Sequence, residues 1–362
     1  MHARIAVLPG DGVGPEVTAS AVAVLRALGE RFNHHFEFTE GLIGGAAIDA
    51  AGDPLPAETI TICKNADAVL LGAVGGPQWS HTSAELRPEQ GLLRLRRELG
   101  VYANVRPVTP DPSLIGASPL RPELLDGVDI CFVRELTGGI YFGDKTRDAD
   151  SASDLCSYST MEIERVVRLA AKLAMARKRK LTSIDKANVL ETSRLWRETT
   201  TRVVTTEFPE VELEHLLVDA AAMHLLTRPA SFDVMVTENL FGDILTDEAS
   251  VLAGSMGMLP SASLGDGNPG LFEPIHGSAP DIAGQGIANP CGMIASAALL
   301  LRHALGLAKE ANAVERTIAE TIGDGWRTPD IATAGAKGAS TVQITAEILK
   351  RIAVAEHALR SA

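Results

Sequence analysis

The stretch RIAVLPGDGVGPEVTASAVAVLRALGERF, residues 4–32, gives the clearest local indication of the fold class. Its first part, 4–10, contains a four-residue apolar run that stops at Pro9-Gly10, which predicts a strand. Pro15 suits the first turn of a helix. The residues that follow form one apolar stripe at helical spacing, made of Val17, Ala21, Val24, Leu25 and Leu28. A strand that leads directly into an amphipathic helix indicates an α/β fold.

The same alternation returns along the chain. Strands are predicted at 67–77, 211–218 and 232–237, and the last two lead into helical patterns. This order argues for α/β architecture with at least some parallel sheet. Segment 136–159 is polar with β-type ends, which fits a protruding hairpin or arm, or a plain surface loop. Segment 271–290 reads as a long irregular segment, and its apolar residues favour a functional loop over disorder.

The first glycine cluster, PGDGVGPE (9–16), is similar to the start of a dinucleotide-binding loop. The GxGxxG pattern anchored on Gly10 and Gly12 needs a third glycine at position 15, where Pro15 stands. The cluster is therefore not the Rossmann pattern. A tight turn that leads into a helix is favoured over a phosphate-binding loop.

Charge and composition exclude several kinds of partner. The formal net charge is 33 − 46 = −13, whereas a nucleic-acid-binding protein needs a basic face. The apolar stretch 291–308 contains Arg302 and His303 and falls short of the roughly 20 apolar residues of a bilayer span, so we expect a buried helix and no membrane partner. The apolar run before Pro9-Gly10 is too short for a signal peptide. The four cysteines match no zinc spacing, and we expect reduced, buried thiols in a cytoplasmic protein.

In a chain of this charge, a small anion can bind only where cations gather. Two segments supply arginines: 87–107 with Arg94, Arg96, Arg97 and Arg106, and 132–139 with Arg134. Such a set suits a dicarboxylate held by paired guanidinium–carboxylate hydrogen bonds. The alternative for any single arginine is a solvated helix face. Arg106 and Arg134 are the more suggestive because apolar residues and turns surround them.

Acidic residues gather in NLFGDILTDEAS, 239–250. Asp243 and Asp247 lie four residues apart, which places both carboxylates on one face of the predicted helix, where like charges repel. Asp219 falls at a strand–helix junction, a position that also suits an N-cap. Oxygen ligands of this kind suit Mg²⁺ or Mn²⁺, and a bound ion would turn repulsion into attraction. Spacing alone leaves a metal site and an exposed acidic face as alternatives.

Tyr141 in GGIYFG and Lys186 in SIDKANVL are candidate proton carriers. Spacing does not distinguish either one from a packed tyrosine or an ordinary surface lysine.

Taken together, the motifs resemble the β-decarboxylating hydroxyacid dehydrogenases, the isocitrate/isopropylmalate dehydrogenase family. The resemblance covers nearly the whole chain, and it is specific because of the number and order of the motifs. They are LPGDGVGPEV (8–17), DPLP (53–56), LLGAVGGPQW (70–79), RPEQGLLRLRRELGVYANVRP (87–107), VRELTGGIYFG (133–143), DKANVLETSRLWR (185–197), VDAAAMHLL (218–226), NLFGDILTDEAS (239–250), GMLPSASLG (257–265) and FEPIHGSAPDIAGQGIANP (272–290).

The resemblance implies a fold and an activity. The fold is that of the family, two α/β domains with a large mixed sheet and a β arm near 136–159, and not a standard Rossmann fold. Residues 1–101 with 254–362 would bind the cofactor, and 102–253 would carry dimerisation, metal and substrate. The implied activity is oxidative decarboxylation of (2R,3S)-3-isopropylmalate to 2-oxoisocaproate (4-methyl-2-oxopentanoate) and CO₂ with reduction of NAD, a step of leucine biosynthesis.

The resemblance also implies roles for the candidate residues. Arg96, Arg106 and Arg134 would bind the malate carboxylates, and Tyr141 and Lys186 would carry protons. These are the expected substrate-binding and catalytic groups.

A divalent metal, Mg²⁺ or Mn²⁺, would be held by Asp219, Asp243 and Asp247, and Asp219 would also contact substrate. Because the family takes the equivalents of Lys186 and Asp219 from the second subunit, the resemblance implies a homodimer with shared active sites.

NAD would bind to segment 276–289. The residues implied are His276, Gly277, Ser278, Ala279, Pro280, Asp281, Ile282 and Asn289. Asp281 would bind the adenosine ribose and Asn289 would lie near the adenine. Because Asp281 would repel a 2′-phosphate, NAD is expected over NADP. Gln285 and Cys291-Gly292 depart from the family pattern at the edge of this region.

Glu89, Leu92 and Leu93 precede the arginines and would contact the variable part of the substrate. An apolar wall there suits an isopropyl group and offers nothing to a third carboxylate, so isocitrate is disfavoured. The alternatives are a related tartrate/D-malate or homoisocitrate dehydrogenase and, from another class, a non-redox metal-binding or assembly module on the same scaffold. The retained Arg, Tyr, Lys and Asp set argues against the module.

Overall fold

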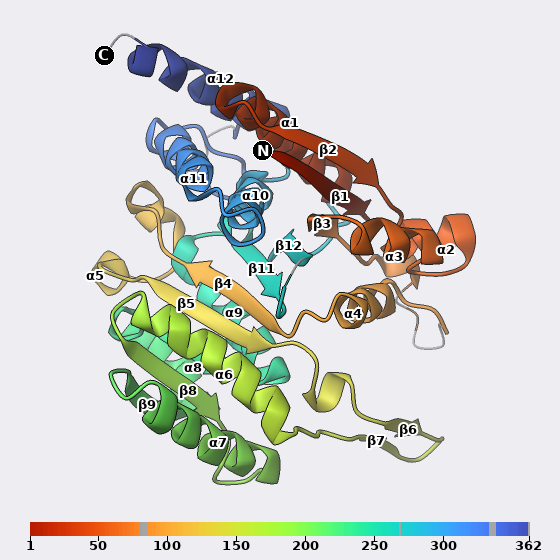
Figure 1. The fold of residues 1–362 in the computed structure, drawn as a ribbon, viewed down its shortest axis with the longest axis vertical. Helices are drawn as coiled ribbons and strands as arrows, with labels where there is room; N and C mark the ends of the chain where they lie inside the picture. The colour runs from red at the N-terminus through yellow and green to blue at the C-terminus, as the bar shows by residue number, and fades with distance from the viewer. Residues whose placement is uncertain (80, 82–84, 268, 333–337, 361–362) are drawn as a thin grey trace. The chain divides into compact units, whose positions relative to one another are not determined.

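The computed structural model describes residues 1–79, 81, 85–267, 269–332 and 338–360, with side chains as far as residue 353. The chain separates into two compact units. Unit 1 comprises Met1–Gly100, Asp111–Ala117 and Ala253–Ala362, and unit 2 comprises Val101–Pro110 and Ser118–Leu252. Strands and helices alternate in both units (Figure 1), which confirms the predicted α/β class.

Unit 1 contains a mixed sheet. Its strands lie in the order β2 (His35–Glu40), β1 (His2–Gly10), β3 (Ala68–Ala73), β12 (Gly270–Pro274) and β11 (Pro260–Leu264). β1 runs parallel to β2 and β3, and β12 runs parallel to β3. β11 is antiparallel to β12.

Helices cover the unit 1 sheet on both faces, and the side-chain alternation along β1 explains why. Ile5 and Val7 belong to one core cluster, while Ala6 and Leu8 belong to another. The first cluster contains residues of α1 (Gly14–Phe32), α10 (Cys291–His303), α11 (Ala308–Gly323) and α12 (Thr341–Arg360). The second contains residues of α3 (Ala57–Lys64) and α4 (Pro88–Glu98), and α2 (Gly44–Ala51) contacts β1 and α4. A strand buried on both faces reads as a continuous apolar run, as residues 5–8 do.

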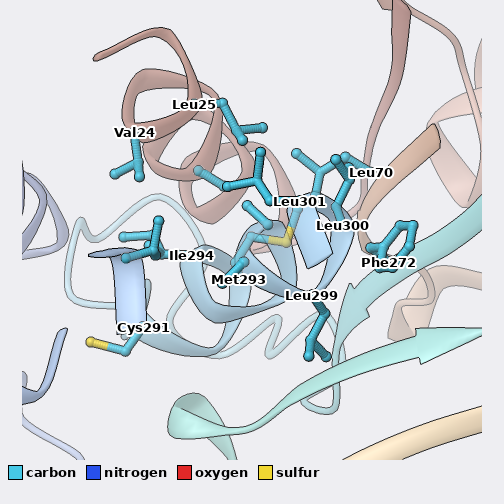
Figure 2. Packing of buried hydrophobic residues seen from close by; sticks show 14 of the residues in the cluster. Val24, Leu25, Leu70, Phe272, Cys291, Met293, Ile294, Leu299, Leu300 and Leu301 are labelled. Carbon is cyan, nitrogen blue, oxygen red and sulfur yellow. The ribbon is translucent and has the colours of Figure 1, made fainter. Parts of the chain in front are cut away.

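Figure 2 shows the first of these clusters from close by. Leu25 of α1 lies near Leu300 and Leu301 of α10, and Phe272 of β12 packs at the edge of the group. The buried helix predicted within 291–308 is confirmed as α10, which ends at His303. No helix in the described part of the chain combines the length and apolar character needed to cross a bilayer.

The main strands of unit 2 also pair in both parallel and antiparallel orientation. The order is β4 (Ala103–Val108), β5 (Ile130–Glu135), β10 (Val234–Thr237), β8 (Lys180–Asp185) and β9 (Glu212–Leu217). β4 is antiparallel to β5, and the other pairs are parallel. The helices are α5 (Pro122–Leu125), α6 (Thr160–Met175), α7 (Glu191–Glu207), α8 (Val218–Thr227) and α9 (Asn239–Ala249).

The parallel strands of unit 2 bring candidate residues to one edge. Thr237 is in register with Arg134 on β5 and with Ile184 on β8, and Asp185 is in register with Leu217 on β9. The carboxyl ends of β5, β10, β8 and β9 therefore lie along the same edge. Segments that follow such ends are where α/β proteins place functional groups.

The arm is a hairpin of β6 (Lys145–Arg147) and β7 (Ala152–Asp154), both exposed. The hairpin expected within 136–159 is confirmed, but the β-type ends were wrong. Gly139–Tyr141 forms a 3₁₀ turn, because Gly139 takes a φ of +73° that an extended strand does not allow.

A second correction concerns segment 271–290. Its first residues form strand β12, and the irregular part starts only after Pro274. Leu271 and Phe272 point to opposite core clusters, so pairing with β3 and burial on both faces outweigh the local signal of the Gly and Pro residues. The cysteines are unpaired as expected. Cys63, Cys131 and Cys291 are buried, and Cys156 is half-buried.

Candidate active site

Arg134, the fifth residue of β5, is buried at the carboxyl edge of unit 2. Its Nη1 donates to Oδ1 of Asp243. Its Nε and Nη2 both donate to Oδ1 of Asn239, at 3.0 and 2.8 Å. The guanidinium is therefore held from one side by a neutral amide and from the other by a carboxylate.

Arg106, on β4, reaches the same carboxylate. Its Nη2 lies 3.9 Å from Oδ1 of Asp243. Its Nε donates to Oδ1 of Asn104 at 2.5 Å, and its Nη1 donates to Oγ1 of Thr246 at 2.5 Å. Two arginines predicted from the sequence to bind substrate are thus brought together around Asp243.

Tyr141 belongs to the same cluster. Its hydroxyl donates to Oδ2 of Asp243 at 2.7 Å, and its ring lies 5.5 Å from Cζ of Arg134. Burial, the hydrogen bond to Asp243 and the charge of that carboxylate raise the pKa of Tyr141 to about 12. The hydroxyl therefore stays protonated at neutral pH and is available as a proton donor.

Asp243 and Asp247 lie on α9, as predicted. Desolvation and the charge of Asp243 raise the pKa of Asp247, against the lowering effect of Arg106 and Arg134. Two carboxylates that repel each other on one helical face can be stabilised by a divalent cation that binds both. This pair therefore has the ligand chemistry of a Mg²⁺ or Mn²⁺ site. Within the described residues, however, no group of three or more potential His, Cys, Asp or Glu ligands forms in the single chain, so Asp219 does not join this pair.

Asp219 and Lys186 form a separate pair. Lys186 follows β8, and its Nζ donates to Oδ1 of Asp219 at 2.6 Å. That hydrogen bond lowers the pKa of Asp219. The N-cap alternative for Asp219 is wrong, because the N-cap of α8 is Leu217 and Asp219 lies in the first turn. The carboxylate is 65% exposed, so it faces solvent in the isolated chain.

In unit 1, α4 carries the other predicted substrate residues. Glu89, Leu92, Leu93 and Arg96 follow the i, i+3, i+4, i+7 spacing, so they share one helical face. Arg96 is buried, and its Nη2 donates to Oε1 of Glu273 on β12 at 2.9 Å. This ion pair joins residues far apart in the sequence and was not predicted.

The glycine-rich turn at 9–16 is a turn that leads into α1, as the sequence favoured. The amide of Val13 donates to the carbonyl of Ser278 at 2.8 Å. Gly12 has a φ of +58°, and a Cβ there would lie 2.0 Å from the same carbonyl oxygen. Glycine is thus needed for the turn to approach segment 276–289 closely.

A cavity of about 230 Å³ lies beside this segment in unit 1. Four of the predicted cofactor residues line it: His276, Ala279, Ile282 and Asn289. The structure adds Val13, Ser255, Gly257, Ile287, Ala288, Pro329 and Asp330. Gly277, Ser278, Pro280 and Asp281 are not among its lining residues, and Asp281 is exposed on the adjoining loop.

The polar groups of this cavity suit a heteroaromatic ring. Nε2 of His276 is buried without a hydrogen-bond partner among the described residues, and burial lowers the pKa of this imidazole, which favours the neutral ring. Nδ2 of Asn289 donates to Asp330 at 3.1 Å. A small, mostly apolar cavity with one unpartnered polar ring atom has the character of a site for part of a small ligand.

Comparison with known proteins agrees with this geometry. The family model for isocitrate/isopropylmalate dehydrogenase matches residues 4–348. A 3-isopropylmalate dehydrogenase of Anaeromyxobacter dehalogenans (strain 2CP-C) is 61% identical over 358 residues, which is 98% of this chain and 100% of the relative. The enzyme of the same name from Bacillus subtilis (strain 168) is 58% identical and covers 96% of each chain.

Solved structures give the same result. Isocitrate dehydrogenase from Methylococcus capsulatus matches with a TM-score of 0.86 and 34% identity, over 97% of this chain and 99% of that one. The apo form of a β-decarboxylating dehydrogenase from Thermococcus kodakarensis matches with a TM-score of 0.78 and 38% identity, over 97% and 96%.

The fold and the relatives define an α/β oxidoreductase. The chain belongs to the isocitrate/isopropylmalate dehydrogenase family, which confirms the resemblance drawn from its motifs.

Proposed function

We propose that this chain converts (2R,3S)-3-isopropylmalate to 2-oxoisocaproate and CO₂ with reduction of NAD, in leucine biosynthesis. The observation that carries the proposal is the cluster in which two buried arginines, Arg106 and Arg134, surround Asp243 beside the Tyr141 hydroxyl. The relatives that carry the name of this activity support it.

Substrate binding would use the arginines. Arg106 and Arg134 each present a guanidinium held from behind by an amide, so little side-chain entropy is lost when a carboxylate binds. Arg96, fixed by Glu273, would bind substrate as well. The malate carboxylates would take their charge-assisted hydrogen bonds from these three groups.

Proton transfer would use two groups. Lys186 removes the proton of the C2 hydroxyl as hydride leaves C2, and CO₂ then departs from C3 with its bonding electrons left on the substrate. Tyr141, protonated at neutral pH, returns a proton to C3. The chain thus supplies a base at the C2 oxygen and an acid at C3. Lys186 takes one proton and Tyr141 gives one, so the number of protons on the enzyme is unchanged.

Two bound groups complete the chemistry. A divalent cation, Mg²⁺ or Mn²⁺, supplies Lewis acidity at the C2 oxygen, and NAD accepts the hydride. Asp243 and Asp247 would hold the cation together with Asp219. Segment 276–289, with its cavity and Asp281, would hold NAD. Unit 1 would act as the cofactor unit and unit 2 as the metal and dimerisation unit.

A homodimer would bring the separate pairs together. Lys186 and Asp219 of the partner subunit would complete the site, since they stand apart from Asp243 in one chain. Exposed apolar side chains on α8 and α9, two helices in contact, support a partner surface there, because monomers rarely expose large contiguous apolar patches. They are Met223 at 56%, Leu226 at 37% and Ile244 at 58% exposure. Unpaired thiols, three buried and one half-buried, fit a protein that works in the reducing cytoplasm.

Leu92 and Leu93 would select the substrate side chain. An apolar wall separates an isopropyl group from smaller groups by only about 1–3 kcal/mol, so slower turnover of D-malate is expected. A group that carries a third carboxylate gains nothing from this wall.

One assay tests the proposal. Purified protein with NAD and Mg²⁺ is mixed with isopropylmalate, and formation of NADH is followed by absorbance. We expect turnover with kcat/KM highest for isopropylmalate among isopropylmalate, D-malate, tartrate, homoisocitrate and isocitrate. Absence of turnover with isopropylmalate, or a clear preference for another of these acids, would overturn the assignment.

A further inference from the structure

We infer that Asn239 is a positioning residue. Its one side-chain amide aligns both the Arg134 guanidinium and the loop that carries Tyr141. The inference rests on the proposed function and deepens it, because it assigns to one neutral side chain the relative placement of a substrate-binding group and the proton donor.

The amide of Asn239 has two different ends, and both are used. Oδ1 accepts from Nε and Nη2 of Arg134, at 3.0 and 2.8 Å, and Nδ2 donates to the carbonyl of Gly138 at 3.2 Å. A guanidinium can only donate and a carbonyl can only accept, so these partners fix the orientation of the amide. Asn239 is 1% exposed, so no water competes for these bonds.

The contact to Gly138 controls Tyr141. Gly138 directly precedes the turn Gly139–Tyr141, and the opposite side of the loop is held by buried Glu135, whose carboxylate accepts from the amides of Thr137 and Gly138, both at 2.8 Å. The loop is thus tied at one end to β5 and at Gly138 to α9. A shift of this carbonyl would displace the Tyr141 hydroxyl from Asp243.

Asn239 is itself held by Tyr158 and Glu238. The Tyr158 hydroxyl accepts from the backbone amide of Asn239 at 3.0 Å and donates to Oε2 of Glu238 at 3.1 Å. A Cβ at Gly138 would lie 2.6 Å from the Tyr158 ring, so the loop packs directly on this support. Hydrogen bonds therefore hold both the backbone of Asn239 and its side-chain amide.

Asn104 provides an internal comparison. It is fully buried, and its Oδ1 accepts from Nε of Arg106, just as Oδ1 of Asn239 accepts from Nε of Arg134. Both asparagines therefore hold the guanidinium of an arginine, and Nδ2 of Asn239 also donates to the carbonyl of Gly138.

The experiment compares Asn239→Ala, Asn104→Ala and Thr317→Ala with the wild type in steady-state kinetics with isopropylmalate. Thr317 is buried on α11 and loses one hydrogen bond, to the carbonyl of Ala313, so it controls for general damage to the fold. Thermal unfolding and gel filtration of every variant check that it is folded and assembled like the wild type.

We expect both asparagine variants to raise KM for isopropylmalate about 10- to 100-fold, the effect of misplacing a charged hydrogen-bond donor. Asn239→Ala should also lower kcat by at least about 10-fold, because the Tyr141 hydroxyl shifts. Thr317→Ala should keep both constants near the wild-type values. An Asn239→Ala enzyme with wild-type KM and kcat, or with no larger effect than Thr317→Ala at equal loss of stability, would overturn the inference and leave the proposed function standing. A wild type without turnover would overturn both.

Discussion

The Tyr141 hydroxyl donates a 2.7 Å hydrogen bond to Asp243, the carboxylate to which Arg134 also donates. One acidic side chain therefore positions the proton donor and a substrate-binding arginine. Because Asp243 is also a proposed metal ligand, the acid, the arginine and the cation would all contact one carboxylate of α9.

Replacing Tyr141 by Phe removes the hydroxyl and keeps the ring against Arg134. We expect kcat to fall about 10²- to 10⁴-fold, the range for loss of a general acid, while KM for isopropylmalate changes little. Steady-state rates with saturating NAD measure both. A variant that retains more than half of wild-type kcat would show that another group protonates C3.

Asp247→Asn removes one of two carboxylates that face a shared position. We expect the Mg²⁺ concentration for half-maximal activity to rise at least about 10-fold, while the protein stays folded. Calorimetric titration with Mn²⁺ gives a readout independent of turnover. Glu248→Gln, one residue further along α9, is the matched control and should bind metal like the wild type. Equal metal affinity in Asp247→Asn and the control would refute the ligand assignment.

Asp281→Lys exchanges an exposed acid for a base on the proposed NAD loop. A positive charge attracts a 2′-phosphate, so we expect the ratio of kcat/KM for NADP over NAD to rise about 10-fold or more. The control is Glu320→Lys on α11, which makes the same charge change at an exposed site with an ion pair to Arg316. An unchanged cofactor ratio in Asp281→Lys would place the adenosine ribose elsewhere.

His215 on β9 predicts a pH dependence of stability. Burial and the charge of Arg197 lower the pKa of His215, so the folded protein holds this proton less tightly than the unfolded chain does. The free energy of unfolding should therefore fall as the pH drops below the unfolded pKa of about 6.5, and this loss should level off below the folded pKa.

His215→Gln removes this contribution and preserves a polar partner for Thr201, whose hydroxyl lies 2.8 Å from Nε2. Urea unfolding at pH 7 and pH 5 measures the difference. We expect a smaller loss between the two pH values in the variant. An equal or larger loss would show that His215 does not titrate differently on folding.

Local patterns account for what the sequence predicted well. The β1–α1 alternation and the helix with Asp243 and Asp247 on one face follow from residue spacing over a single element. The family motifs added the candidate residues of unit 2, and the structure brings Arg106, Arg134, Tyr141 and Asp243 into one cluster.

Long-range contacts account for what was missed. Glu273 meets Arg96 across 177 positions of sequence, and Asp330 enters the cavity of the 276–289 segment from a distant turn. No local pattern carries such information. Gly292, a departure from the family pattern, is also explained by a long-range contact. A Cβ at this position would lie 2.9 Å from the carbonyl oxygen of Gly257.

In the proposed homodimer, each active site takes Tyr141 from one subunit and Lys186 from the other. Protomers with Tyr141→Phe and with Lys186→Ala are co-expressed with different affinity tags, and the mixed dimer is purified and assayed with isopropylmalate, NAD and Mg²⁺. One of its two sites then combines both intact groups, so we predict about half of wild-type activity, far above either mutant homodimer. A mixed dimer no more active than the two mutant homodimers would contradict the shared site.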